Sequence, residues 1–305
     1  MLSRGSLAVV FAGALAAFSP APSFAQEALM TQPSGIGFAP INPRAEWLDE
    51  DFWNAGIIPV PENHKVRETQ VTYKGPKGDI PALLFRPDDD KKYPAVLFQH
   101  GRAGMVDMVR LHAKRVAARG FVVLAPDVYA AYFVERPVPH DYSYEADVGA
   151  GLDHLLALSD VSTRRACLYS HTRGGYYTLK VSVTQNRQAD AAACYVSYYP
   201  HWQDPNAPEA DQVYRYAGEV DKLTLPVMVF IGEHEQYQRR RSIETAIDSM
   251  TKGGRDARLY VYAGVGRGFD FRPFAVRTLA DDMASKDALM RSAAFMRKHL
   301  KSYKK

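Results

Sequence analysis

The stretch "ACLYSHTRGGYYTL", Ala166 to Leu179, decides the fold of this chain. It opens with a short apolar run typical of a buried strand and closes with a stretch that fits a helix. Between them lies a polar turn, "SHTRGG" (170–175), whose two glycines let the helix pack closely behind the strand. The stretch therefore predicts a strand, a tight turn and a helix in direct succession.

The same succession of strand and helix recurs along the chain. Apolar strands are predicted at residues 94–100, 121–129, 166–170, 191–199, 226–233 and 258–264, and helices at 105–119, 145–158, 174–187, 239–252 and 280–301. Continuous apolar strands with helices between them indicate a parallel sheet that is covered on both faces. Ligands of such sheets bind beyond the carboxyl ends of the strands, so the residues after each strand determine function.

An antiparallel hairpin precedes this region. Segments 65–75 and 79–87 alternate apolar and polar residues and flank the turn "PKG" (76–78). The sequence shows no internal repeat and no second domain. We therefore expect one α/β domain over residues 65–305, with a mostly parallel central sheet, helices on both faces and an N-terminal antiparallel hairpin.

The N-terminus carries the features of an export signal. Arg4 supplies a positive charge, residues 7–18 form an apolar run, and "SFA" (23–25) contains the small residues of a cleavage site. The apolar run is shorter than the roughly 20 residues of a membrane-spanning helix. We expect a periplasmic or secreted protein with no stable membrane insertion after cleavage. It divides into a signal peptide (1–25), an extended leader (26–64) and the α/β domain (65–305).

Composition excludes some partners and leaves the state of the cysteines open. The net charge is +4 and no basic run is interleaved with aromatics, so nucleic acid is not an expected partner. The triplet Arg239 to Arg241 is typical of a solvated helix start.

Cys167 and Cys194 lie in strand-like runs, where they form a disulfide if the strands are neighbours and otherwise remain buried thiols. The histidines and carboxylates show no metal-ligand spacing, so neither a metal nor another cofactor is expected.

Five motifs follow one another in a fixed order along the domain. They are "VLFQHGRAG" (96–104), "GFVVLAPDVY" (120–129), "SHTRGG" (170–175), "FIGEHEQY" (230–237) and "YAGVGRGF" (262–269). Together they resemble the dienelactone hydrolase family of the α/β-hydrolase fold, over roughly residues 65–300. The resemblance implies that the first motif helps to form an oxyanion hole and that the third is the nucleophile elbow. It also implies that the last two motifs are the acid loop and the histidine loop.

Matched residue by residue, the family's nucleophile falls on Thr172, its acid on Glu235 and its base on Arg267. A hydroxyl attacks an ester usefully only when a base takes its proton. A guanidinium with a pKa above about 12 does not accept that proton at pH 7. The β-branched Thr172 also fits a strained elbow less well than serine does. We therefore expect a substituted triad with little conventional hydrolysis.

Three arginines at motif positions, Arg102, Arg173 and Arg267, are expected around one pocket. Together with Gly101 of the oxyanion loop, His171 and the N–H groups that begin the elbow helix, they would bind a small carboxylate or similar anion. The opposing interpretation is an ion pair between Arg267 and the acid of the triad, with the other two arginines pointing to solvent.

Two further functions stay open at this point. The protein could hydrolyse an ester or lactone with Thr172 as nucleophile and His201, in a loop that overhangs the pocket, as base. Alternatively, tyrosine-rich segments such as "YYPHW" (198–202) could form a surface that binds other proteins. A histidine within hydrogen-bonding reach of the Thr172 hydroxyl would favour catalysis, whereas Arg267 alone would favour binding.

Overall fold

The computed structural model describes residues 36–37, 63–133, 144–203, 208 and 210–305. The predicted signal peptide and nearly all of the predicted leader lie outside these residues. Of the leader, Ile36 and Gly37 form a two-residue strand, β1, which pairs with the last strand of the main sheet. Within the described part of the chain, no helix is both long enough and apolar enough to cross a membrane.

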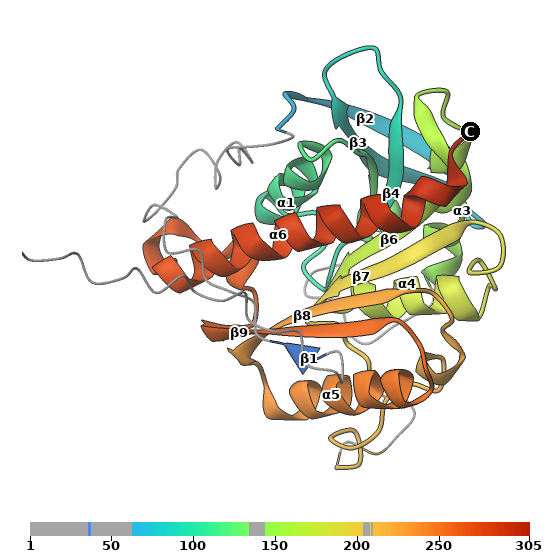
Figure 1. Cartoon of the computed structure of the whole chain (residues 1–305). Coiled ribbons are helices and arrows are strands. Elements are labelled where there is room, and N and C mark those ends of the chain that lie inside the picture. Colours follow the sequence, from blue (N-terminus) through green and yellow to red (C-terminus); the bar gives the residue numbers. More distant parts are fainter. Residues whose placement is uncertain (1–35, 38–62, 134–143, 204–207, 209) are drawn as a thin grey trace, which may run out of the picture.

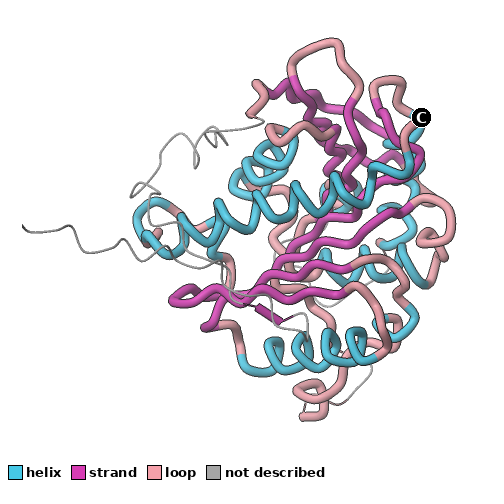
Figure 2. The backbone as a smooth tube through the Cα atoms, viewed as in Figure 1, coloured by secondary structure: helices cyan, strands magenta, loops and turns pink. Residues whose placement is uncertain are grey.

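The strands of the described residues form one mixed sheet of nine members (Figures 1 and 2). After β1 they are β2 (Val66–Lys74), β3 (Asp79–Pro87), β4 (Tyr93–Gln99), β5 (Val122–Pro126), β6 (Val161–His171), β7 (Ala192–Tyr198), β8 (Val227–His234) and β9 (Ala257–Gly266). Their order across the sheet is β1-β9-β8-β7-β6-β4-β5-β3-β2. β2 and β3 form the predicted antiparallel hairpin, and β3 joins β5 in the antiparallel sense. The pairings from β5 through β1 are parallel, so the predicted sheet is confirmed.

Helices cover both faces of the sheet, as expected. They are α1 (Asp107–Ala117), α2 (Val128–Ala131), α3 (Glu145–Ala157), α4 (Gly174–Val183), α5 (Tyr237–Lys252) and α6 (Leu279–Leu300), with short 3-10 turns η2 (Val220–Lys222), η3 (Phe269–Phe271), η4 (Phe274–Val276) and η5 (Lys301–Tyr303). α1 and α6 pack side by side on one face, and α3 and α4 pack together on the other (Figure 1). α6 begins with a capping box, in which the side chains of Thr278 and Asp281 each accept the other's backbone N–H. This box fixes the point where the chain leaves the loop after β9.

The hydrophobic core lies between the sheet and the helices. β5 and β7 are buried along their whole length, as unbroken apolar sequences predict for central parallel strands. The tyrosine-rich segment at the end of β7 belongs to this core, because Tyr198, Tyr199 and Trp202 are buried. The hypothesis that this segment forms a protein-binding surface is therefore wrong, since buried rings are not available to a partner.

A disulfide joins β6 to β7. Cys167 and Cys194 occupy directly paired positions of these neighbouring parallel strands, and their Cα atoms are 4.6 Å apart. That separation lies within the usual range for disulfides. The sequence left the bridge open, and the strand order decides it because the two cysteines stand side by side.

Candidate functional site

The turn between β6 and α4 has the backbone of a nucleophile elbow. Thr172 stands at its apex with a φ of +50°, in the left-handed region that β-branched residues rarely adopt. Two glycines after Thr172 allow other segments of the chain to pack close behind the turn. A Cβ on Gly174 would lie 2.5 Å from the carbonyl oxygen of Gln99, and one on Gly175 would lie 2.6 Å from Cβ of Pro200. The predicted tight turn is therefore present, and the two glycines are required by packing.

In the part of the chain that the structure describes, no base forms a hydrogen bond with the hydroxyl of Thr172. Its Oγ1 is buried and has no hydrogen-bond partner among the residues that the structure describes. It faces the backbone of Gly101, where an added Cβ would collide with it. His201, the predicted alternative base, meets this residue through its backbone, whose N–H donates to the carbonyl oxygen of Thr172 at 2.9 Å. Among the described residues, neither a histidine nor Arg267 therefore reaches the hydroxyl.

Arg267 is held by Glu235, the residue that the motifs match to the family's acid. Its Nη1 donates to Oε1 of Glu235 at 3.0 Å, and its Nη2 donates to the carbonyl oxygen of Tyr199 at 3.0 Å. The guanidinium carbon lies 4.9 Å from the centre of the Tyr199 ring, within cation–π range. The Glu235 side chain is fully buried and also accepts the backbone N–H of Gln236 at 2.9 Å. The ion pair between Arg267 and Glu235, which the opposing interpretation of the sequence predicts, is thus formed.

A cavity of about 390 Å³ lies beside the elbow. Its lining includes each predicted site residue apart from Glu235, namely Gly101, Arg102, His171, Thr172, Arg173, His201 and Arg267. Apolar walls come from residues such as Val106, Val109 and Phe271. The predicted residues therefore meet in one concave site at the carboxyl ends of the strands, where ligands bind in such sheets.

Among the described residues, four arginines line this cavity, one more than the sequence indicated. Arg173 is only 1% exposed, so the expectation of the opposing interpretation that it points to solvent is wrong, whereas Arg102 is exposed. The fourth is Arg239, which we expected on a solvated helix start. It is half-buried and lines the cavity because α5 begins directly after the acid loop.

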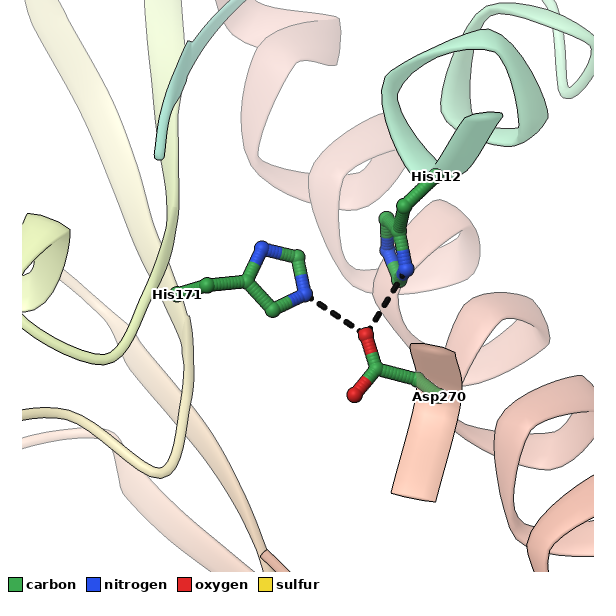
Figure 3. A group of neighbouring side chains, drawn as sticks. All are labelled: His112, His171 and Asp270. Carbon is green, nitrogen blue, oxygen red and sulfur yellow. Dashed lines mark hydrogen bonds and ion pairs between the residues drawn. The ribbon is translucent and has the colours of Figure 1, made fainter. Parts of the chain in front are cut away.

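A buried cluster that the sequence did not predict lies next to the cavity (Figure 3). Nε2 of His171 lies 2.7 Å from Oδ2 of Asp270, and Nδ1 of His112 lies 2.8 Å from the same oxygen. Tyr199 donates its hydroxyl to the other carboxylate oxygen, and the hydroxyl of Tyr169 lies 2.7 Å from Nε2 of His112. A search for metal-ligand spacing along the sequence did not find this group of three residues.

Burial and mutual contacts set the charges of this cluster. Burial raises the pKa of Asp270, but the charge of His171 and the hydrogen bonds from both histidines outweigh burial and hold that pKa well below its usual value. Burial, followed by the charge of His171, lowers the pKa of His112 to about 4. Arg115 donates to the carbonyl oxygen of Asp270 at 3.2 Å. Its pKa, lowered by burial to about 9, leaves it protonated at pH 7. The cluster thus holds a carboxylate, a neutral His112 and a compensating guanidinium.

The ligand-type atoms of His112, His171 and Asp270 lie within 4.8 Å of one another, close enough to surround a metal ion. Their distances favour a hydrogen-bonded cluster instead. Ligand atoms that stand about 2.0–2.1 Å from a tetrahedral ion are roughly 3.3 Å apart. The two contacts with Asp270 are 2.7 and 2.8 Å, shorter than such an edge. The positive charge of Arg115 also opposes a bound cation, and we assign no metal to these residues.

The sheet order, the strained elbow after β6, the acid after β8 and the loop after β9 define an α/β-hydrolase fold. Solved structures agree with this assignment. A thermostable carboxylesterase cloned from a metagenomic library has a TM-score of 0.60 at 20% identity, with 82% of this chain and 93% of that chain covered. A brefeldin A esterase, a bacterial homologue of human hormone-sensitive lipase, has a TM-score of 0.59 at 17% identity, with 83% of each chain covered. A hyperthermophilic esterase from Pyrobaculum calidifontis has a TM-score of 0.58 at 17% identity, with 76% and 83% covered.

At these identities the structural likeness establishes the fold alone. The family comes from the sequence, because the model of the dienelactone hydrolase family matches residues 80–300. The chain therefore belongs to the dienelactone hydrolase family, and the resemblance carried by the five motifs is confirmed. A comparison with curated proteins finds no match to the chain.

Proposed function

We propose that this dienelactone-hydrolase-like protein binds a small anionic ligand, a carboxylate or ester-like molecule, in the cavity beside Thr172, with little conventional hydrolysis. The observation that carries the proposal is the state of the substituted triad. Thr172 Oγ1 has no base within reach among the described residues, and Arg267 is bound to Glu235. A guanidinium is a strong donor to anions and a poor proton acceptor, so such a site suits binding better than acyl transfer.

The charge of the cavity supports an anion as its occupant. Four guanidinium groups line it, those of Arg102, Arg173, Arg239 and Arg267. The carboxylate of Glu235 is already paired with Arg267. Charge-assisted hydrogen bonds to a carboxylate are roughly twice as strong as neutral ones. The ring of Phe271 and the neighbouring aliphatic side chains suit a ligand that also carries a hydrocarbon part.

Isothermal titration calorimetry with benzoate and with succinate tests this proposal. We expect wild-type protein to bind at least one of them, and Arg102→Ala and Arg267→Ala to bind it about tenfold or more weakly. Each variant removes a charge-assisted contact, and a loss of about 1.4 kcal/mol corresponds to a tenfold weaker affinity. Arg258→Ala is the matched control, because Arg258 pairs with Asp256 at 3.2 Å and does not line the cavity. Equal affinities in all four proteins, or no binding by wild type, would overturn the proposal.

The strained backbone of the elbow favours a second function, hydrolysis of an ester or lactone with Thr172 as nucleophile. A non-glycine residue in the left-handed region costs about 1–3 kcal/mol, and such strain is concentrated at active sites. Thr172 has this conformation, with a φ of +50°. Hydrolysis of p-nitrophenyl acetate that is lost in Thr172→Ala would support this function, and hydrolysis that survives the substitution unchanged would exclude it.

We further propose that the protein acts in the periplasm or outside the cell. The predicted signal peptide supports export, and the Cys167–Cys194 disulfide supports an oxidising compartment. Cell fractionation with N-terminal sequencing of the purified protein tests this. We expect a mature chain that begins directly after Ala25, and a cytosolic protein that retains Met1 would contradict it.

A further inference from the structure

Tyr199, which directly follows β7, is held in a strained backbone conformation. Its φ is +37°, in the left-handed region that residues with a bulky side chain rarely adopt. Strain of this kind persists only where the surrounding contacts fix it, and it is concentrated at functional sites. The backbone N–H of Tyr199 donates to the carbonyl oxygen of Phe230 in β8 at 2.7 Å, and the residue is fully buried. Neighbouring groups therefore hold Tyr199 in a conformation that it would not adopt alone.

Two groups of Tyr199 meet the guanidinium of Arg267. The carbonyl oxygen of Tyr199 accepts a hydrogen bond from Nη2 at 3.0 Å, and the centre of its ring lies 4.9 Å from Cζ. A cation–π contact is strongest where the ring and the cation are shielded from water, as they are beside a fully buried ring. The strained residue thus supplies both an acceptor and an aromatic face to one side of this guanidinium.

The hydroxyl of Tyr199 fixes the ring from its far end. It donates to Oδ1 of Asp270, whose Oδ2 lies 2.7 Å from Nε2 of His171 and 2.8 Å from Nδ1 of His112 (Figure 3). Burial, followed by the charge of Asp270, raises the pKa of Tyr199 well above its usual value, so the phenol stays protonated and donates. The ring is therefore attached to the sheet through its backbone and to the loop after β9 through its hydroxyl.

Arg267 keeps donors that these contacts do not use. A guanidinium has five N–H groups, of which one donates to Glu235 and one to the carbonyl oxygen of Tyr199. The other three have no partner among the described residues. The side chain is 21% exposed, and Arg267 lines the cavity beside the elbow. Because a guanidinium is planar and rigid, contacts on one side fix the directions of the donors that remain.

We propose that Tyr199 is the positioning residue of Arg267. Its role in ligand binding rests on the proposed function, since an anion in the cavity is the partner that the remaining donors would take. The single hydrogen bond to Glu235 leaves the guanidinium able to turn, whereas the carbonyl oxygen and the ring of Tyr199 define its plane. An anion then meets a guanidinium that is already ordered, so less side-chain entropy is lost on binding.

Isothermal titration calorimetry with benzoate and succinate tests the role in binding. Tyr199→Phe keeps the ring and lacks the hydroxyl, whereas Tyr199→Leu lacks both. We expect Tyr199→Leu to bind the probe at least tenfold more weakly than wild type, and Tyr199→Phe to stay within about threefold, because only the first loses the cation–π contact. Tyr73→Phe and Tyr73→Leu are the matched controls, since this buried tyrosine of β2 donates to the carbonyl oxygen of Asp147 and does not line the cavity. Equal affinities of wild type and Tyr199→Leu would overturn the inference.

Nitrogen NMR of arginine-labelled full chain measures the order of the guanidinium without any ligand, and Arg267→Ala identifies the signals. We expect separate Nη signals for Arg267 in wild type and in Tyr73→Leu, because rotation about the Nε–Cζ bond is slow, and averaged signals in Tyr199→Leu. Tyr199→Phe, the milder change, should rotate faster than wild type and replaces Tyr199→Leu if that variant does not fold. Averaged signals in wild type, or rotation as slow in the Tyr199 variants as in wild type, would overturn the inference.

The two measurements together separate this inference from the proposed function. Separate Nη signals that depend on Tyr199, with neither probe bound by wild type, defeat the binding site and leave Tyr199 as the residue that positions Arg267. Averaged signals in a wild-type protein that binds benzoate or succinate do the reverse.

Discussion

The guanidinium of Arg267 donates to the carboxylate of Glu235 across 3.0 Å, and these are the two residues that the sequence motifs match to the family's base and acid. A histidine–carboxylate pair can take a proton from a hydroxyl and return it, because imidazole titrates near neutral pH. An arginine–carboxylate pair keeps its protons at that pH. At the triad positions that the motifs imply, such a pair would keep the hydrogen bond and lose its chemistry, in agreement with a Thr172 hydroxyl that has no hydrogen-bond partner among the described residues.

Removal of Arg267 should destabilise the fold. Arg267→Met leaves the fully buried Glu235 carboxylate without its ion-pair partner, and breaking a buried pair from one side costs about 3–5 kcal/mol. We expect a loss of this size in the free energy of unfolding measured with urea at pH 7.5. Arg267→Met combined with Glu235→Leu should recover most of the lost stability because no unpaired charge then remains buried. If Arg267→Met alone is as stable as wild type, Glu235 has found another partner.

Restoration of the family's residue types should create an acyl-enzyme. Thr172→Ser combined with Arg267→His places a serine on the strained elbow and an imidazole within reach of Glu235. General-base catalysis contributes about 100-fold to 10,000-fold, so we expect the double variant to exceed both single variants by at least 100-fold with p-nitrophenyl acetate. A burst of p-nitrophenol would identify the covalent intermediate. If the double variant is no faster than Thr172→Ser alone, the substituted triad is not what limits conventional hydrolysis.

The strands, the helices and the elbow were predictable because each is determined by residues that are adjacent in the sequence. A buried parallel strand is continuously apolar, and the glycines of the turn mark where chain segments touch. Thr172, Glu235 and Arg267 were found through motif order, and the structure brings them to one edge of the sheet. What the motifs could not decide was whether Arg267 pairs with Glu235 or faces a ligand, because both outcomes satisfy its charge.

The His112–His171–Asp270 cluster was missed because its members come from three distant segments. α1, the end of β6 and η3 meet only when the sheet is assembled, so no spacing in the sequence joins them. One signal was available, an aspartate directly after the motif "YAGVGRGF". It indicates a cluster only once the fold is known to place it beside His171. Arg239 was misjudged for a related reason, since a helix start is solvated only where no cavity adjoins it.

Removal of the disulfide should weaken the fold without altering the cavity. Cys167 and Cys194 are 27 positions apart, and the loop-closure entropy of such a bridge corresponds to about 3–4 kcal/mol. Cys167→Ala with Cys194→Ala is expected to lose roughly this much stability in urea unfolding, with succinate affinity unchanged in the surviving folded protein. Thiol titration of denatured wild type without reductant should find no free thiol, and two free thiols would contradict the bridge.

Chelation should leave the protein unaffected. The contacts of Asp270 at 2.7 and 2.8 Å are hydrogen-bonding distances, and Arg115 already balances its charge. We therefore expect the same thermal midpoint after dialysis against EDTA and after addition of zinc or manganese chloride. A ligand present at 100 times its dissociation constant stabilises a protein by about 2.7 kcal/mol. A midpoint that rises by several degrees with one of these metals would show that the cluster takes a cation.

The buried histidine of α1 should make the fold sensitive to mild acid. His112 has an ordinary pKa of 6.5 when unfolded and one lowered to about 4 in the fold, so between these values the unfolded chain binds more protons. Stability is therefore fully present above pH 6.5 and is lost as the pH falls toward 4, by an amount on the order of 3 kcal/mol. The depressed pKa of Asp270 adds a second loss below about pH 4, where the unfolded carboxylate is protonated first.

Urea unfolding at intervals between pH 7.5 and 4 measures this dependence. His112→Gln should be less stable than wild type at pH 7.5 but show a flatter slope between pH 6.5 and 4, because the titrating group is gone. Leu152→Ala is the matched control, since it removes a fully buried side chain of α3 and leaves every titratable group in place. It should lose about 2–5 kcal/mol at all pH values and keep the wild-type slope. If His112→Gln and Leu152→Ala have the same slope, then His112 is not the group that titrates.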